Sequence, residues 1–121
     1  MSKSKAEAPF AYSGLDRIFH EKARLGIVSS LVGTPDGLTF SDLKSLCGLT
    51  DGNLNRHMQV LEDAGYLDVV KGHDGRRPQT RVYLSNSGRK DFSAYLEVLE
   101  DVLRKAAGAN AENKHRRKVL S

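Results

Sequence analysis

Amide and guanidinium side chains gather in one short segment that begins at Thr50. Such groups can form paired hydrogen bonds with base edges, Asn and Gln with adenine and Arg with guanine. Leu54, Met58 and Leu61 recur through the segment at helical spacing, so a helix would turn them to a core and the polar residues outward. The alternative is an ordinary solvated helix face. The residues predicted to contact DNA from this helix are Thr50, Asp51, Gly52, Asn53, Asn55, Arg56 and Gln59.

A second candidate for DNA contact is the basic segment 71–81, which carries four basic residues and one acidic residue. Arginines on a projecting loop can neutralise phosphates or enter the minor groove. The alternative is a solvated loop without a partner. The residues predicted to contact DNA from this loop are Lys71, Arg76, Arg77 and Arg81.

The elements that must position these side chains begin with a row of apolar residues, four apart, from Leu15 to Leu31. This row predicts a first helix that ends near Gly33. Residues 38–40 are too few for more than a short strand or an extended link. Ser41 is the expected N-cap of a second, short helix with one apolar face.

Thr50 is the expected N-cap of the third helix, which carries the amide and guanidinium side chains. Residues 66–70 and 82–84 are β-rich and predict a two-stranded hairpin with a long, basic tip. Ser85 can cap a final helix, and the chain becomes polar from Gly108. The order of these elements predicts an α+β, mainly helical fold: a winged helix-turn-helix with a two-stranded wing and a C-terminal dimerisation helix.

The length of 121 residues fits one domain with a single core. We expect a flexible N-terminal arm over residues 1–13 and a winged-helix domain that includes the C-terminal helix over 14–107. Residues 108–121 are expected to form a polar basic tail.

Apolar residues seven apart in the final helix predict a seam at which two helices pair. Further apolar side chains on the first helix lie off its main row and could cover the other side of a subunit interface. The alternative is that both stripes pack within one subunit. The residues predicted at a homodimer interface are Ile18, Leu25, Phe92, Tyr95, Leu99 and Val102.

Three segments of the chain resemble the MarR-like winged-helix regulators, in particular their short single-domain branch. The segments read LTDGNLNRH at 49–57, LEDAGYL at 61–67, and GRRPQT with YLS between 75 and 85. The resemblance covers Leu15 to about Leu103. It implies a homodimer on a palindromic operator in double-stranded DNA, often acting as a repressor, with the third helix in the major groove and the wing beside it. The identity of any small-molecule effector is left unknown.

Other function classes find little support. Cys47 is the only cysteine, which excludes an intrachain disulfide or a thiolate metal cluster; beside Leu46 on an apolar face, it is expected to be a small buried hydrophobe. The four histidines lack ligand spacing, so neither a metal nor a cofactor is predicted. His57 is expected near the backbone or core. No catalytic motif is present, which makes an enzyme the weakest class.

Bulk properties agree with a polyanionic partner without requiring one. The formal net charge is +4, and the sequence pI is about 9.3. No apolar run suits a membrane span or a secretory signal, so a cytoplasmic location is favoured.

The rivals from other classes are a protein-interaction winged helix, which should expose an apolar patch, and an RNA-binding winged helix, which should present stacking aromatics.

Overall fold

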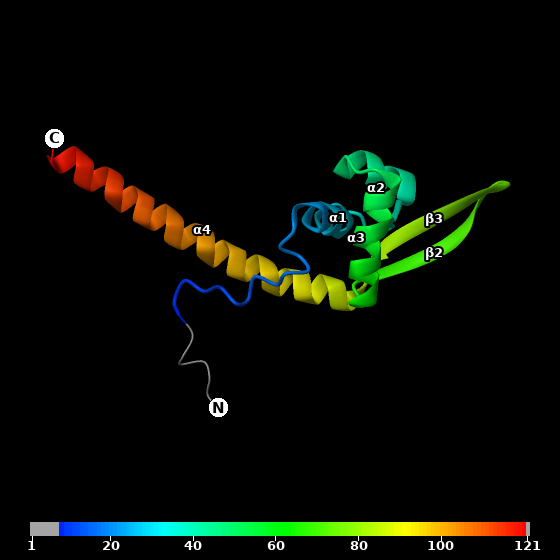
Figure 1. Cartoon of the computed structure of the whole chain (residues 1–121), viewed down its shortest axis with the longest axis horizontal. Coiled ribbons are helices and arrows are strands. Elements are labelled where there is room, and N and C mark those ends of the chain that lie inside the picture. Colours follow the sequence, from blue (N-terminus) through cyan, green and yellow to red (C-terminus); the bar gives the residue numbers. More distant parts are fainter. Residues whose placement is uncertain (1–7, 121) are drawn as a thin grey trace, which may run out of the picture.

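The computed structural model describes residues 8–120 and confirms the winged helix-turn-helix fold (Figure 1). Helices dominate, and a small antiparallel sheet carries the wing, so the prediction of a mainly helical α+β fold is correct. In chain order the elements are α1 (Lys22–Val32), β1 (Leu38–Thr39), α2 (Phe40–Cys47), α3 (Asp51–Asp63), β2 (Leu67–Asp74), β3 (Arg77–Leu84) and α4 (Asn86–Leu120). None of these helices is long and apolar enough to cross a membrane.

The wing is a tight hairpin, and the prediction of a long tip is wrong. Strands β2 and β3 pair along their whole length, and Asp74 lies opposite Arg77. The turn therefore contains two residues, the first of which, Gly75, has φ of +66° and suits a tight hairpin turn. Strand β1 pairs with β3 only at Arg81 and Val82. Pro78, nearer the tip, lies where β3 is an edge strand on that side, and an edge tolerates the missing N–H.

Helix α1 begins at Lys22, about two turns later than the apolar row predicts. Glu21 is the N-cap, and its carboxylate accepts a hydrogen bond from the backbone N–H of Arg24 at 2.9 Å. The preceding residues form turns, which direct the fully buried Phe19 into the core. The four-residue spacing was misleading because Phe19 reaches the core from a turn.

Helix α2 is capped by Thr39, and the prediction of Ser41 as its N-cap is wrong. The Thr39 hydroxyl accepts from the backbone N–H of Asp42 at 3.0 Å, while the Asp42 carboxylate accepts from the Thr39 N–H. This reciprocal capping box satisfies two otherwise unpaired donors. Leu46, predicted on the apolar face, is 65% exposed, and Cys47 is half-buried.

An aromatic cluster joins α4 to the rest of the core. The Phe19 ring stacks on Tyr66 with centroids 4.8 Å apart and contacts the rings of Phe92 and Tyr95 at 5.3 and 5.7 Å. Phe92 and Tyr95 are 3% and 1% exposed. They therefore belong to the core of the single chain, which corrects their assignment to a subunit interface.

Helix α4 continues to Leu120, past the boundary expected at Gly108. Its C-terminal half extends away from the other elements in Figure 1. The part of the N-terminal arm that the structure describes lies against it, and the Lys105 Nζ is 5.7 Å from the centroid of the Phe10 ring and 5.6 Å from that of Tyr12. Residues 1–7 of the arm and residue 121 of the tail lie outside the described residues.

Gly88 allows the first turn of α4 to approach Tyr66, which directly precedes β2, and Leu84 at the end of β3. A Cβ at this position would lie 2.6 Å from the carbonyl oxygen of Tyr66 and 2.8 Å from Leu84 Cδ1. We expect Gly88→Ala to lower the free energy of unfolding by about 1–3 kcal/mol because the backbone must shift. Urea denaturation measures the change. Gly108→Ala in the same helix, where a Cβ meets nothing within 4 Å, is the control and should not destabilise; equal effects of both changes would contradict the close-packing argument.

Candidate nucleic-acid interface

Helix α3 presents its polar residues outward, as the sequence predicts. The Thr50 hydroxyl caps it by accepting from the Asn53 N–H at 3.2 Å. Leu54, Met58 and Leu61 are buried in the core. The opposite and N-terminal positions are exposed, and they are Asp51, Gly52, Asn53, Asn55, Arg56 and Gln59.

Several of these exposed side chains already have partners. Arg56 Nη2 donates to the Asn53 amide oxygen at 3.3 Å, and Gln59 Nε2 donates to Asp63 at 2.8 Å. Asp51 forms an ion pair of 2.9 Å with Lys44 of α2. These exposed contacts are weak in water. They can therefore be exchanged for contacts with a ligand at small cost.

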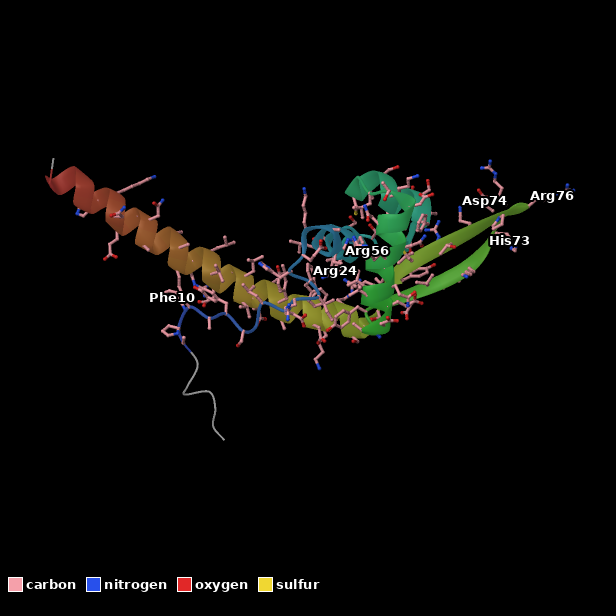
Figure 2. All side chains as sticks on the ribbon, viewed as in Figure 1. Phe10, Arg24, Arg56, His73, Asp74 and Arg76 are labelled. Carbon is pink, nitrogen blue, oxygen red and sulfur yellow. The ribbon has the colours of Figure 1, made fainter. Side chains whose placement is uncertain are left out.

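The wing carries its basic residues at and near the tip. Arg76 lies at the end of the hairpin in Figure 2, beyond α3 and away from α4. Lys71, Arg76 and Arg77 are exposed. Arg81 differs, because its Nη1 donates to the backbone oxygens of Asp36 and Gly37 at 3.2 and 3.1 Å. This contact fastens β3 to the turn before β1, and the assignment of Arg81 to the DNA-contacting set stays a prediction.

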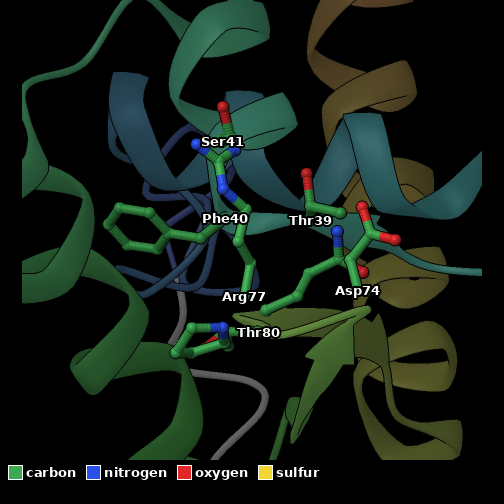
Figure 3. Close-up of a pocket in the computed structure, with 8 residues that line it drawn as sticks. Thr39, Phe40, Ser41, Asp74, Arg77 and Thr80 are labelled. Atoms are coloured by element: carbon green, nitrogen blue, oxygen red, sulfur yellow. The ribbon is translucent and has the colours of Figure 1, made fainter.

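A surface groove of about 390 Å³ lies between the N-terminus of α2 and the wing (Figure 3). Arg77 lines it from β3, and its side chain extends toward Ser41 of α2 in this view. Thr80 and Gln79 line it from the same strand. The sequence prediction missed Ser41, Gln79 and Thr80 as part of this surface. The one sequence signal for this surface was the basic segment that contains Gln79 and Thr80. Ser41 could not be assigned to it from sequence, because α2 and the wing come together only in the folded chain.

His57 is on the inner side of α3, next to Arg56 in the sequence and 5% exposed. Its Nδ1 lies 3.1 Å from Arg24 Nη1 and 3.7 Å from the Glu21 carboxylate. Burial lowers the pKa of the imidazole from its ordinary value of 6.5, and the nearby carboxylate opposes that shift only in part. The hydrogen bond from the Arg24 backbone N–H lowers the pKa of Glu21, burial opposes that shift in part, and the Arg24 guanidinium adds to it. The expectation that His57 lies near the core is correct.

Comparison with known proteins identifies the class. Residues 23–103 match the family model described as "Winged helix DNA-binding domain". The chain belongs to this winged-helix family. The winged-helix DNA-binding class predicted from the sequence is thereby confirmed.

The similar proteins each cover more than two thirds of this chain. An uncharacterized protein of Methanocaldococcus jannaschii is 34% identical over 85 residues, which are 69% of this winged-helix chain and 91% of that protein. The structure of a transcriptional regulator homologue from Pyrococcus horikoshii OT3 superposes with a TM-score of 0.70 at 30% identity, covering 75% of this chain and 89% of that one. The MepR–DNA complex of S. aureus superposes with a TM-score of 0.64, covering 89% and 86%; at 18% identity it supports the fold alone.

Proposed function

We propose that this winged-helix protein is a transcription regulator that binds a palindromic operator as a homodimer and acts as a repressor. The observation that carries the proposal is the exposed amide and guanidinium face of α3, with buried leucines behind it and a cationic wing beside it. A helix fits the major groove, where these groups can distinguish base pairs. The similar structure of a transcriptional regulator homologue from Pyrococcus horikoshii OT3, which is 30% identical, agrees with this role. A cytoplasmic location is part of the same proposal, because the protein must have access to DNA.

In the proposed complex, Asn55 and Arg56 contact base edges. A Cβ at Gly52 would meet nothing within 4 Å, so the first turn of α3 is open to a phosphate, which the helix dipole and free N–H groups attract. Arg76 contacts the flanking backbone or the minor groove. Arg77 binds a phosphate over the groove beside α2, where the Ser41 hydroxyl can donate a second hydrogen bond.

The domain boundaries and the homodimer are part of the proposal. Residues 14–107 form the working unit, with the arm and the tail outside it. Because Phe92 and Tyr95 are buried, the interface moves toward the end of α4. Leu99 and Val102 are half-buried there, as are Ile18 and Leu25. Leu96 and Leu103, seven residues apart, are 41% and 62% exposed and extend the seam to a second helix.

Leu103→Glu should convert the dimer into a monomer. A carboxylate in an apolar helix seam loses its hydration without gaining a partner, so we expect dimerisation at least about tenfold weaker. Light scattering after size exclusion measures the mass at micromolar concentration. Ala94→Glu adds the same charge to an exposed position on the opposite side of α4 and should leave the mass at two chains. One mass for wild type and both variants would contradict this interface.

Selection of bound DNA from a random double-stranded pool tests the function. We expect enrichment of one sequence with twofold symmetry and half-sites about one helical turn apart. Placing that sequence over a promoter should reduce transcription when the protein is present. An asymmetric site would contradict the homodimer. No enriched sequence, or preferential binding of an RNA pool, would contradict the regulator and favour the rival modules.

A further inference from the structure

Arg24 connects the turn before α1 to the buried side of α3. Its Nε donates to the backbone oxygen of Ile18 at 2.7 Å, and its Nη2 donates to that of Arg17 at 3.3 Å. Its Nη1 lies 3.1 Å from His57 Nδ1. The Arg24 side chain is 15% exposed. One guanidinium therefore holds three groups from two separate parts of the chain.

The contact with His57 fixes the state of the imidazole. A guanidinium has donors and no acceptor, so Nδ1 must accept and the second ring nitrogen must carry the proton. A protonated imidazole has no free lone pair to accept the hydrogen bond. The Arg24–His57 contact therefore exists only while His57 is neutral.

The same turn also contacts α4. His20 Nδ1 and the Tyr95 hydroxyl are 2.8 Å apart, and Phe19 lies among the rings of Tyr66 and Tyr95. Residues 17–21 thus contact α4 through Phe19 and His20. They are linked to α3 by Arg24 of α1, which binds their backbone oxygens and His57. This segment lies between the helix proposed to form the dimer and the helix proposed to read DNA.

We propose that Arg24 is a positioning residue that fixes the rotation of α3 about its own axis through the hydrogen bond to His57. This inference rests on the proposed function of α3. Apolar packing at Leu54 and Met58 has no strong directional preference, whereas a hydrogen bond weakens steeply when its angle changes. Rotation of α3 would displace Asn55 and Arg56, which flank the buried positions. Arg24 therefore contributes to sequence preference without touching DNA.

The test compares affinity for the selected operator with affinity for random double-stranded DNA of the same length. Arg24→Met keeps the length of the side chain and removes all its donors. We expect the operator-to-random ratio to fall at least about tenfold, because a buried acceptor loses its partner and α3 is released. Arg24→Lys retains one cationic donor and should restore part of the ratio. Arg17→Met removes the same charge from the same turn at an exposed position and should leave the ratio unchanged.

A pH profile supplies a readout that loss of stability alone would not produce. Burial lowers the pKa of His57; among the charged groups that face it, the Glu21 carboxylate raises this pKa, and the cations Arg56 and Arg24 lower it further. The ratio should therefore hold near pH 7 and fall as the pH drops below about 6.5 through the lowered pKa. His57→Gln offers an amide oxygen that does not titrate, so its ratio should stay flat. Protonation of exposed histidines that changes the affinity for operator and random DNA equally cancels in this ratio.

The outcomes separate the two hypotheses. A wild-type protein with no operator preference would overturn both the proposed function and the positioning role. A wild-type preference that Arg24→Met retains in full would overturn the positioning role alone. If circular dichroism shows that Arg24→Met is unfolded, the pH profile decides, with the charge of His57 followed by NMR over the same pH range. A wild-type ratio that stays constant while the imidazole becomes protonated would overturn the role of the Arg24–His57 contact.

Discussion

Replacing Arg56 with Ala is expected to lower affinity for the selected operator by about 1–3 kcal/mol for each half-site and to relax the preference at one base position per half-site. Arg56 is exposed on α3 and is joined only loosely to Asn53 by a hydrogen bond of 3.3 Å. Its fork of donors is therefore available to a guanine edge in the major groove. Competition titrations against operators with each base changed in turn measure both the loss and its position.

Arg104→Ala is the matched control for Arg56→Ala, since it removes the same charge from an exposed site on α4, far from α3 in sequence. Its side chain is 66% exposed and contacts only Asp101 among the described residues. We expect operator affinity to stay nearly constant in this variant. Loss of affinity for every sequence alike in Arg56→Ala would instead place Arg56 on the phosphate backbone.

The double replacement of Arg76 and Arg77 by Ala weakens binding to all DNA sequences and flattens its dependence on salt. Each phosphate contact releases condensed counterions, so each contact makes the logarithm of the affinity fall with the logarithm of the salt concentration by a slope of about 0.9. Two lost contacts in each subunit, four in the dimer, should therefore reduce the slope by about 3.6. Titrations from low to physiological salt measure it. Both side chains are exposed at the wing, so the change should leave folding intact.

Lys90 and Arg104 provide the control pair for the wing, because both are exposed cations of α4. Replacing both with Ala changes the net charge equally and should alter the salt slope little. An unchanged slope in the Arg76, Arg77 variant would remove the wing from the DNA footprint. A loss confined to one operator sequence would assign the wing to base recognition instead.

The recognition helix could be predicted from sequence because its signals are local. Thr50 is a favoured N-cap, and the spacing of Leu54, Met58 and Leu61 fixes which face is buried. Local pattern and tertiary packing agree for this helix. For the same reason, the exposure of Asn55 and of its polar neighbours could be predicted without coordinates.

The start of α1 and the interface on α4 could not be predicted, because both depend on which partner covers an apolar side chain. Periodicity predicts that Phe19, Phe92 and Tyr95 are buried, but it does not identify the residues that pack against them. In the fold they cover one another, across more than seventy residues of sequence. A seven-residue spacing therefore fits core packing as well as pairing with another subunit.

The backbone contacts of Arg81 and the short turn of the wing could not be predicted from sequence for a related reason. Charge alone places Arg81 with the other basic residues, whereas its donors bind backbone oxygens more than forty residues earlier in the chain. Gly72 and Pro78 read as turn residues, yet both lie in strands. Pairing between strands outweighed their low intrinsic strand preference.

The fully paired ladder of the hairpin restricts how the wing can change in length. Removing one cross-strand pair, such as Gly72 with Gln79, would retract the tip by about 3.3 Å. It would also turn the tip side chains to the opposite face, because successive residues of a strand alternate. Only the loss or gain of two pairs, a step of about 6.6 Å, preserves the direction of the arginines. Natural or engineered wings of this design should therefore differ in length by multiples of four residues.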